Sequence, residues 1–336
     1  MFKVYSHGKD LPELWDQIIK DKHFLSREIL MQLEKLNPCH QRYHLNGEKG
    51  IVLVSYPLKM NLFTFLKAAS FKVPIQIIGV PLSVSSSGYE VNQEVLLEDL
   101  CQYVGSLKGF SLILNVDAQL NLPEGYTLPT CRLKIKWSSF EEYLEKMRSH
   151  YRYRIHKAIK KFGSVQIELL KDNRMFDEEM YELYLEVYKN SREKLEKLPI
   201  DFFREFPARI FSFKIPGEIL GFVQLVERAE ELIFLFGGFR HKRNQQYDLY
   251  MNMLLAIIDY GIRNGFKSID LGQTAEETKL KLGASQYKKY MYACHSHPFI
   301  NNLIKKLIGK FSYSHYPIVH KVFKEAVDEN PIGKMS

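Results

Sequence analysis

Apolar and polar positions follow one another in patterns that predict strands and helices in both halves of the chain. Short apolar or alternating runs, which are typical of strands, occur in the first half at 50–58, 73–82, 110–117 and 131–137. In the second half they occur at 164–170, 209–215, 219–227, 231–239, 268–273 and 288–295. Apolar residues at helical spacing predict helices over 11–36, 92–107, 175–197 and 245–264. The halves share this order of elements, although no clear sequence repeat accompanies it.

One long helix is predicted to begin at Ser138 and Ser139, because each serine has a Glu three residues later, as in a capping box. Its apolar stripe has spacings of three and four: Phe140, Leu144, Met147, Tyr151, Ile155, Ala158 and Phe162. Gly163 ends this helix, and Gly265 ends the helix over 245–264. Only a few residues around Ala229 separate two strands of the second half, which predicts a hairpin.

These elements predict an α+β fold of mixed, mostly antiparallel sheets with flanking helices, organised as two lobes. We expect an N-terminal lobe over 1–137, a C-terminal lobe over 138–298 and a basic helical tail over 299–336. No linker rich in Pro, Gly or Ser separates the lobes, so close packing is expected.

Composition narrows the class of protein. Of the 336 residues, 46% are hydrophobic and 13% aromatic, which permits substantial cores and argues against extensive disorder. The first residues carry charges throughout, and no apolar run approaches the ~18 residues that span a bilayer, so we expect a cytoplasmic protein. The four cysteines are far apart and fit buried thiols in a reducing compartment. The net charge of +8 favours anionic partners.

A basic face follows the start of the long helix. Residues 148–161 contain six Lys or Arg, two His and no acid. Four of these side chains, spaced by four residues, lie on one face opposite the apolar stripe: Arg148, Arg152, His156 and Lys160. Their mutual repulsion costs helix stability unless an anion binds, and a solvated basic face is an equally weighted interpretation.

A second candidate is the stretch 236–250, in which a strand leads through two glycines and three cations into a helix. Glycines permit close backbone approach, and the first turn of a helix presents unpaired N–H groups. A pyrophosphate site is one interpretation, with charge from Arg240, Lys242 and Arg243. A solvated basic turn is the other. The stretch is neither a Walker sequence nor a G-x-G-x-x-G fingerprint.

The third candidate is IDLGQTAEETKLKLGA (269–284), a short strand, a glycine turn and a helix. Asp270 lies on an otherwise apolar strand, so it needs a hydrogen-bonded or functional partner; capping of a neighbouring loop would satisfy it equally. Metal chemistry is not indicated, because His295 and His297 have no third ligand nearby. The Gly-x-Ser-x-Gly motif of a serine hydrolase is absent.

Together these pieces resemble the GNAT acyltransferase fold. The order of hairpin, glycine turn, helix, strand with Asp-x-Gly, helix and strand matches over roughly 138–292. Two motifs resemble the two-lobed GNAT group of Fem-type peptidyltransferases and related acyl-CoA N-acyltransferases: Arg154, Ala158, Lys160 and Gly163, and then Lys279, Leu282, Gly283 and Ala284. The resemblance implies tandem GNAT-like lobes, the first of them degenerate.

The resemblance also implies a reaction, namely transfer of an acyl group from acyl-CoA, as a co-substrate, to the amine of a small or cell-envelope-related acceptor in a cleft between lobes. The donor would lie at Gly237, Gly238 and Phe239, with Arg240 and the helix start near Asn244. The substrate would be held by Arg152, Arg154, Lys157 and Gln273. Lys279 would stabilise the carbonyl oxygen, Asp270 or Glu227 would accept the proton, and Tyr287 would protonate the leaving group.

Two alternatives stay open. An aminoacyl-tRNA donor, as in Fem-type enzymes, is less favoured because no coiled-coil arm is apparent. A non-catalytic module that binds anionic lipid or nucleic acid would use the basic helix, without specific DNA binding. Residues 299–311 would suit an anionic membrane at its inner face, but a helix packed on the fold is preferred.

Overall fold

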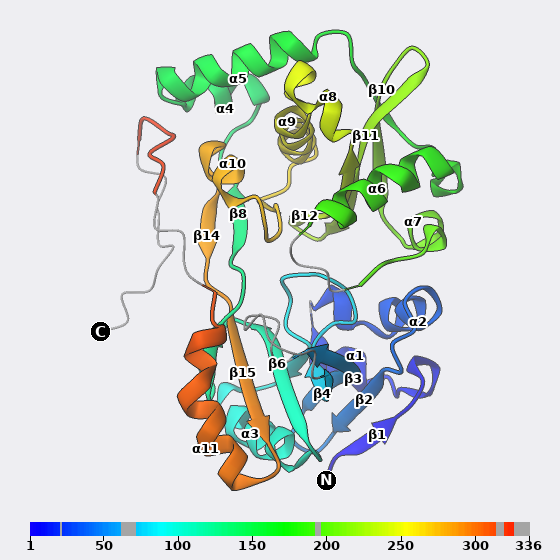
Figure 1. The fold of residues 1–336 in the computed structure, drawn as a ribbon, viewed down its shortest axis with the longest axis vertical. Helices are drawn as coiled ribbons and strands as arrows, with labels where there is room; N and C mark the ends of the chain where they lie inside the picture. The colour runs from blue at the N-terminus through cyan, green and yellow to red at the C-terminus, as the bar shows by residue number, and fades with distance from the viewer. Residues whose placement is uncertain (21, 62–71, 192–195, 314–318, 326–336) are drawn as a thin grey trace. The chain divides into compact units, whose positions relative to one another are not determined.

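The computed structural model describes residues 1–20, 22–61, 72–191, 196–313 and 319–325 (Figure 1). The chain divides into two compact units, one of residues 1–129 with 288–316 and one of residues 130–287 with 317–336. The boundaries therefore differ from those predicted at 137/138 and 298/299. The predicted strand over 131–137 belongs to the second unit and the strand over 288–295 to the first, because each pairs with strands distant in sequence.

The first unit is built on an eight-stranded sheet in the order β1-β2-β3-β4-β6-β15-β7, with β5 paired to β3. The strands are β1 (Lys3–Tyr5), β2 (Arg42–Asn46), β3 (Ile51–Asn61), β4 (Lys72–Ile78), β5 (Tyr89–Val91), β6 (Phe110–Val116), β7 (Glu124–Tyr126) and β15 (Tyr290–His295). The helices are α1 (Leu14–Ile19), α2 (Arg27–Leu36), α3 (Leu97–Ser106) and α11 (Pro298–Leu307). The single helix predicted over 11–36 is wrong, since α1 ends at Lys20, whose φ is 52°, and Ser26 caps α2.

The second unit has a seven-stranded sheet in the order β14-β8-β13-β12-β11-β10-β9. The strands are β8 (Thr130–Lys134), β9 (Gln166–Leu169), β10 (Arg209–Ile215), β11 (Glu218–Arg228), β12 (Glu231–Phe239), β13 (Ser268–Asp270) and β14 (Ser285–Tyr287). The helices are α4 (Phe140–Lys146), α5 (Ser149–Phe162), α6 (Glu178–Asn190), α7 (Ile200–Glu205), α8 (His241–Tyr247), α9 (Leu249–Arg263) and α10 (Glu276–Lys281).

The two sheets follow one plan. Each has a single parallel pair among its described strands, β4 with β6 in the first and β12 with β13 in the second. In each sheet, the strand next to one edge pairs with strands far from it in the sequence. This strand is β15 in the first sheet and β8 in the second. The predicted α+β class with two related lobes is confirmed.

The long helix predicted from Ser138 is two helices. Ser139 caps α4 by accepting a hydrogen bond from the Glu142 N–H at 3.1 Å, as the capping box predicts. Met147 and Arg148 then take extended backbone conformations, and Met147 pairs with Phe323 in an isolated antiparallel bridge. The helical spacing of the apolar stripe continues through this break, so the pattern alone could not show it.

The helix predicted over 245–264 is also divided. Asp248 adopts a left-handed conformation (φ 44°, ψ 46°) between α8 and α9. Buried Asn252 stabilises the break, because its Nδ2 donates to the carbonyls of Tyr247 and Asp248. The terminator at Gly265 (φ 72°) and the hairpin with Ala229 in its turn are confirmed. Of the helix predicted over 175–197, residues 192–195 lie outside the described residues.

The faces of the second sheet differ. One face packs on α9, where Val223, Leu225, Leu232 and Ile269 are buried. The other packs on α6 and α7 through a cluster of rings: Phe176, Tyr184, Phe202, Phe203, Phe222 and Phe236. Because side chains alternate along a strand, Asp270, Thr130 and Arg132 lie on the face opposite α9.

A buried chain of polar side chains crosses the first sheet. His44 Nδ1 lies 2.7 Å from the Tyr103 hydroxyl on α3, and its Nε2 lies 2.7 Å from the Ser55 hydroxyl. Gln76 Nε2 donates to the same Ser55 oxygen at 2.7 Å. Burial, and after it the charge of Arg42, lowers the pKa of His44 from 6.5 to about 4.

We expect the free energy of unfolding to fall as the pH drops from 6.5 to 4. Over this window the unfolded chain binds a proton that folded His44 does not, which amounts to on the order of 3 kcal/mol. Urea unfolding of the wild type and of His44→Gln across these pH values measures it, and the variant should lose most of the slope. His40→Asn is the control, since His40 is exposed and its φ of 57° suits asparagine; an unchanged slope in His44→Gln would contradict the assignment.

Candidate functional site

The strands β12 and β13 separate after a short parallel ladder. Glu231, Leu232 and Ile233 pair with residues 268–270, and over 234–239 no described strand pairs with that edge of β12. After β13 the chain instead bonds to β8, since the Leu271 N–H donates to the Cys131 carbonyl at 2.8 Å. Leu235 forms a bulge in β12, a feature that is common beside functional sites. The divergence leaves the backbone of β12 beyond Ile233 without a described strand partner on that side.

Asp270 lies at the point of divergence and is 3% exposed. Its Oδ1 accepts hydrogen bonds from the Thr130 hydroxyl at 2.6 Å and from the Gly272 N–H at 2.8 Å. Its Oδ2 accepts one from Arg132 Nε at 3.3 Å. These three donors satisfy a buried carboxylate, so the geometry favours a positioning role for Asp270.

Lys279 holds the other side of the same turn. Although only 2% exposed, its ammonium donates to the carbonyls of Gly272 at 3.0 Å and Gln273 at 2.7 Å. Asp270 and Lys279 thus hold Gly272 by its N–H and its C=O. The φ of Gly272 is 74°, and Thr274 (59°) and Ala275 (48°) are also left-handed. Side chains rarely adopt this conformation, so the turn carries backbone strain of a kind found at ligand sites.

Burial lowers the pKa of Lys279 from 10.5 to about 8, against the opposing effects of Cys131, Asp270 and Glu276. At neutral pH the side chain is therefore mostly an ammonium held in an apolar surrounding. Two of its three N–H donors are used, and the third has no acceptor in the described part of the chain. A buried cation with a free donor can stabilise negative charge that develops on a neighbouring oxygen.

Tyr287 belongs to this neighbourhood. It lies on β14 opposite Thr130, and the Arg132 guanidinium is 5.6 Å from the centre of its ring. Gln286, the residue before Tyr287 on β14, donates through its Nε2 to Glu276 on α10. Asp270, Lys279 and Gln273 therefore meet at one turn, and Tyr287 lies on a strand beside the residues that hold Asp270.

Glu227 does not join them. It shares a cross-strand row with Leu232 and Ile269, which face α9, whereas Asp270 faces the opposite side. Its carboxylate is exposed and accepts from the Tyr260 hydroxyl at 2.5 Å and from Arg209 Nε at 3.2 Å. The structure assigns Glu227 to surface contacts on α9 and β10.

The glycines that were predicted to form the donor-binding turn do not lie in a turn. Gly237 and Gly238 lie inside β12, and a Cβ on Gly238 would meet the backbone of Leu183 and Tyr184 on α6 at 2.6 Å. Packing of α6 therefore explains the glycine at 238. Phe239 ends the strand and stacks on His241, and the Asn244 side chain accepts from the Tyr250 N–H at 2.9 Å.

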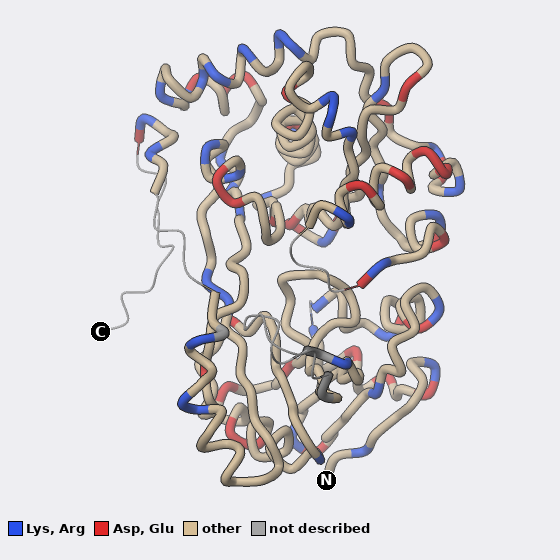
Figure 2. Tube along the Cα trace, viewed as in Figure 1, with Lys and Arg blue, Asp and Glu red and all other residues tan. Residues whose placement is uncertain are grey.

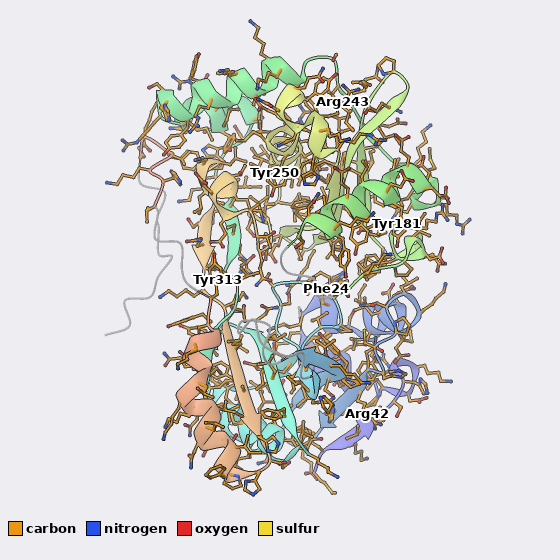
Figure 3. The ribbon with its side chains drawn as sticks, viewed as in Figure 1. Phe24, Arg42, Tyr181, Arg243, Tyr250 and Tyr313 are labelled. Atoms are coloured by element: carbon orange, nitrogen blue, oxygen red, sulfur yellow. The ribbon has the colours of Figure 1, made fainter. Side chains whose placement is uncertain are left out.

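Two of the three cations of that turn, Arg240 and Arg243, are paired with acids, while Lys242 is exposed and has no acidic partner among the described residues. Arg240 donates to Glu179 at 2.5 Å and lies 3.2 Å from Glu218. Arg243, labelled in Figure 3, donates to Glu218 at 2.8 Å. The His241 N–H, the first of α8, donates to Glu186 at 3.2 Å. Carboxylates thus occupy Arg240, Arg243 and the first N–H of α8, which were expected to hold a pyrophosphate.

Helix α5 carries free positive charge instead (Figure 2). Arg154, Lys157 and Lys160 are exposed, and no carboxylate of the described residues pairs with them. Arg152 differs, because its Nη1 donates to the carbonyls of Glu145 and Met147 and so stabilises the end of α4. Among the described residues no group of three or more His, Cys, Asp or Glu could hold a metal ion.

Residues 145–289 match the family model described as acetyltransferase (GNAT) domain. This chain carries a GNAT domain. No curated protein matches the sequence.

Solved structures with the same fold cover nearly the whole chain. The C-terminal domain of a putative lysylphosphatidylglycerol synthetase from Agrobacterium fabrum covers 89% of this chain and 94% of its own, with 10% identity and a TM-score of 0.55. L-PGS from Bacillus licheniformis covers 86% and 96%, with 13% identity and a TM-score of 0.50. FemX is similar over 79% and 90%, with 13% identity and a TM-score of 0.49. The first two likenesses show a shared fold.

The region that matches the GNAT model does not include β8, although β8 carries residues that bond to Asp270. Residues 145–289 include β13, the turn and α10, but β8 lies at 130–134. Thr130 and Arg132 on β8 supply two of the three donors to Asp270. Neither residue could be singled out from the sequence, because nothing in their alternating run indicates which strand they will join.

Gln224 of the GNAT domain was also missed. It is 0% exposed on β11, on the face of Phe222 and opposite Phe236, next to the bulge at Leu235. Both its amide nitrogen and its amide oxygen lack a hydrogen-bond partner in the described part of the chain. A polar residue in an apolar strand is the signal that singled out Asp270, and it applies equally to Gln224.

Gln224→Met is expected to raise the free energy of unfolding by ~1–3 kcal/mol, because methionine has a similar volume and needs no hydrogen bonds. Urea unfolding measures this change. Gln41→Met is the matched control: Gln41 is buried too, but its amide bonds to Asn37 and Cys39, so this variant should be less stable. Equal losses in both variants would contradict the unsatisfied state of Gln224.

Proposed function

We propose that this protein is an N-acyltransferase that moves an acyl group from acyl-CoA to an amine. The observation that carries the proposal is the joint hold of Asp270 and Lys279 on Gly272, where β12 and β13 diverge. A turn fixed on both sides by buried charged groups is preorganised, and preorganised donors are what acyl transfer requires.

In the proposed reaction the amine nitrogen attacks the thioester carbonyl, and negative charge develops on its oxygen. The free N–H of Lys279 stabilises that charge, the carbon–sulfur bond breaks, and the thiol leaves with a proton from Tyr287. The nitrogen loses one proton to water as the amide forms, and Tyr287 regains its proton from water, so that overall one proton moves from the nitrogen to the thiol. Asp270 holds the turn through Gly272 and takes no proton, since three donors already occupy its oxygens.

The donor would lie along the free edge of β12, whose residues 234–239 include Gly237, Gly238 and Phe239. Arg240 and Asn244 would hold the adjoining turn in shape, because both already bond within the chain. The single most informative experiment is thermal unfolding with acetyl-CoA, longer acyl-CoAs and free CoA, followed by thiol release with a panel of amines. Stabilisation by CoA thioesters together with amine-dependent thiol release supports the proposal. If no thioester stabilises the protein and none gives amine-dependent thiol release, the proposal is rejected.

An aminoacyl-tRNA donor is the second candidate, and α5 favours it. Arg154, Lys157 and Lys160 on α5 are exposed and have no carboxylate partner among the described residues, whereas Arg240 and Arg243 beside β12 are paired with acids. A polyanion is attracted by such a face, and its binding weakens with salt.

If tRNA is the donor, replacing Arg154, Lys157 and Lys160 together by Gln should lower its affinity by at least ~10-fold and flatten the dependence on salt. Filter binding across salt concentrations measures both. The control is Lys161→Gln, because Lys161 is already paired with Asp248 at 3.0 Å. Two results together would exclude an aminoacyl-tRNA donor: the wild type does not bind tRNA, and the triple variant releases thiol from acyl-CoA as fast as the wild type.

A further inference from the structure

Helix α11 of the first unit has one half-buried side and another that is exposed, apolar and basic. Its inner side packs on β15, and the turn that follows it (308–311) packs beside β7. On the outer side Phe299 is 74% and Leu303 50% exposed. Apolar side chains this large, one turn apart on a helix, differ from singly scattered exposed residues and indicate a contact surface.

Positive charge continues the same face. Counting from Phe299, steps of four, three and four residues reach Leu303, Lys306 and Lys310, so these side chains lie along one side of the helix and its last turn. Lys305 is also exposed, about 100° around the helix from Lys306, and no described carboxylate pairs with any of the three lysines.

The sequence around α11 contains no opposing charge. Between Glu277 and Glu325 there is no Asp or Glu, while there are nine lysines. Figure 2 shows the lysines of this helix in blue, and the helix has no Asp or Glu of its own. A surface with exposed rings and aliphatic groups beside lysines complements a layer that is apolar inside and anionic at its headgroups.

We propose that Phe299 and Leu303 insert into the surface of an anionic lipid bilayer, with Lys305, Lys306 and Lys310 on the headgroups. The contact is peripheral, since no described helix combines the length and the apolar character needed to cross a membrane. A nucleic acid fits this face less well, because its phosphates would leave Phe299 and Leu303 in water. The inference stands apart from the proposed reaction.

Vesicle sedimentation tests the surface. The full chain is expected to bind vesicles of phosphatidylcholine mixed with phosphatidylglycerol, and to bind phosphatidylcholine alone at least ~10-fold more weakly. Salt should weaken the binding. Replacing Phe299 and Leu303 by Ser, or the three lysines by Gln, should each reduce it by about 10-fold. Val95→Ser is the control, since Val95 is 75% exposed elsewhere in the same unit.

Phe299→Trp supplies a second readout. Trp15 and Trp137 are buried, so a tryptophan at 299 reports its own surroundings, and its emission should shift to the blue on anionic vesicles. The proposal is overturned by absence of binding, by binding that is insensitive to both α11 variants, or by binding that disappears only when the cations of α5 are replaced. An emission that stays that of a solvated tryptophan would also overturn it.

Discussion

Lys279→Met is expected to lower the rate of acyl transfer, measured as kcat/KM, by ~10²–10³-fold. In the wild type a buried ammonium with one free N–H faces the turn that Asp270 also holds. Methionine fills a similar volume but donates no hydrogen bond, so charge on the carbonyl oxygen would lose its donor.

The same change should leave the fold nearly as stable at pH 7, within ~1–2 kcal/mol of the wild type. Two hydrogen bonds to carbonyls are lost, but the cost of burying a charge is removed as well. Urea unfolding at several pH values separates these effects. Because the pKa is about 8 when folded and 10.5 when unfolded, the unfolded chain binds more protons between these values. Wild-type stability should therefore rise from pH 8 to 10.5, and the variant should lack this rise.

Lys281→Met is the matched control. It lies on the same helix, pairs only with Glu277 among the described residues, and should cost no more than ~1 kcal/mol and little activity. Full activity in Lys279→Met would reject the proposed site. If the activity of Lys279→Met falls only in proportion to the fraction of folded protein, the role of Lys279 is structural and not catalytic.

Asp270→Ala is expected to destabilise the protein by ~3–5 kcal/mol, because the Thr130 hydroxyl, the Gly272 N–H and the Arg132 guanidinium all lose their acceptor. Asp270→Asn should cost only ~1–2 kcal/mol, since one carbonyl oxygen can still accept from Thr130 and Gly272. Urea unfolding measures both.

The asparagine variant also separates positioning from base catalysis. If Asp270 only positions the turn, kcat of Asp270→Asn should stay within ~10-fold of the wild type. If Asp270 is a general base, kcat should fall by ~10²–10⁴-fold without a matching change in stability. The control is Asp99→Asn, which breaks an exposed pair with Lys49. A large fall in kcat for a well-folded Asp270→Asn would overturn the positioning role.

Asp270 illustrates how far sequence reasoning reached into the site. A carboxylate on an apolar strand had to find partners, and that requirement follows from the cost of burying an unpaired charge. The partners themselves are 140 and 138 residues away, on β8. No local pattern connects β8 with β13, so their pairing, and with it the role of Asp270, is a tertiary fact.

The donor turn illustrates the opposite outcome. Two glycines before three cations are typical of an anion site, but acids from α6 and β11 pair with Arg240, Arg243 and the first N–H of α8. Glu227 was placed beside Asp270 by strand order, and the alternation of side chains across a parallel pair put the two on opposite faces.

By itself the sequence did not indicate the strands β1, β2, β5, β7 and β14, but it determined the strands that form apolar or alternating runs, the hairpin, the terminators, the α+β class and the likeness to GNAT transferases. These depend on periodicity and on residues adjacent in the chain, so local physical chemistry specifies them. Tertiary structure alone decided the breaks at Met147 and Asp248, the exchange of β8 and β15 between sheets, and the unsatisfied Gln224. Each of these depends on contacts between distant segments, whose energies outweigh local preference and leave no periodic trace in the sequence.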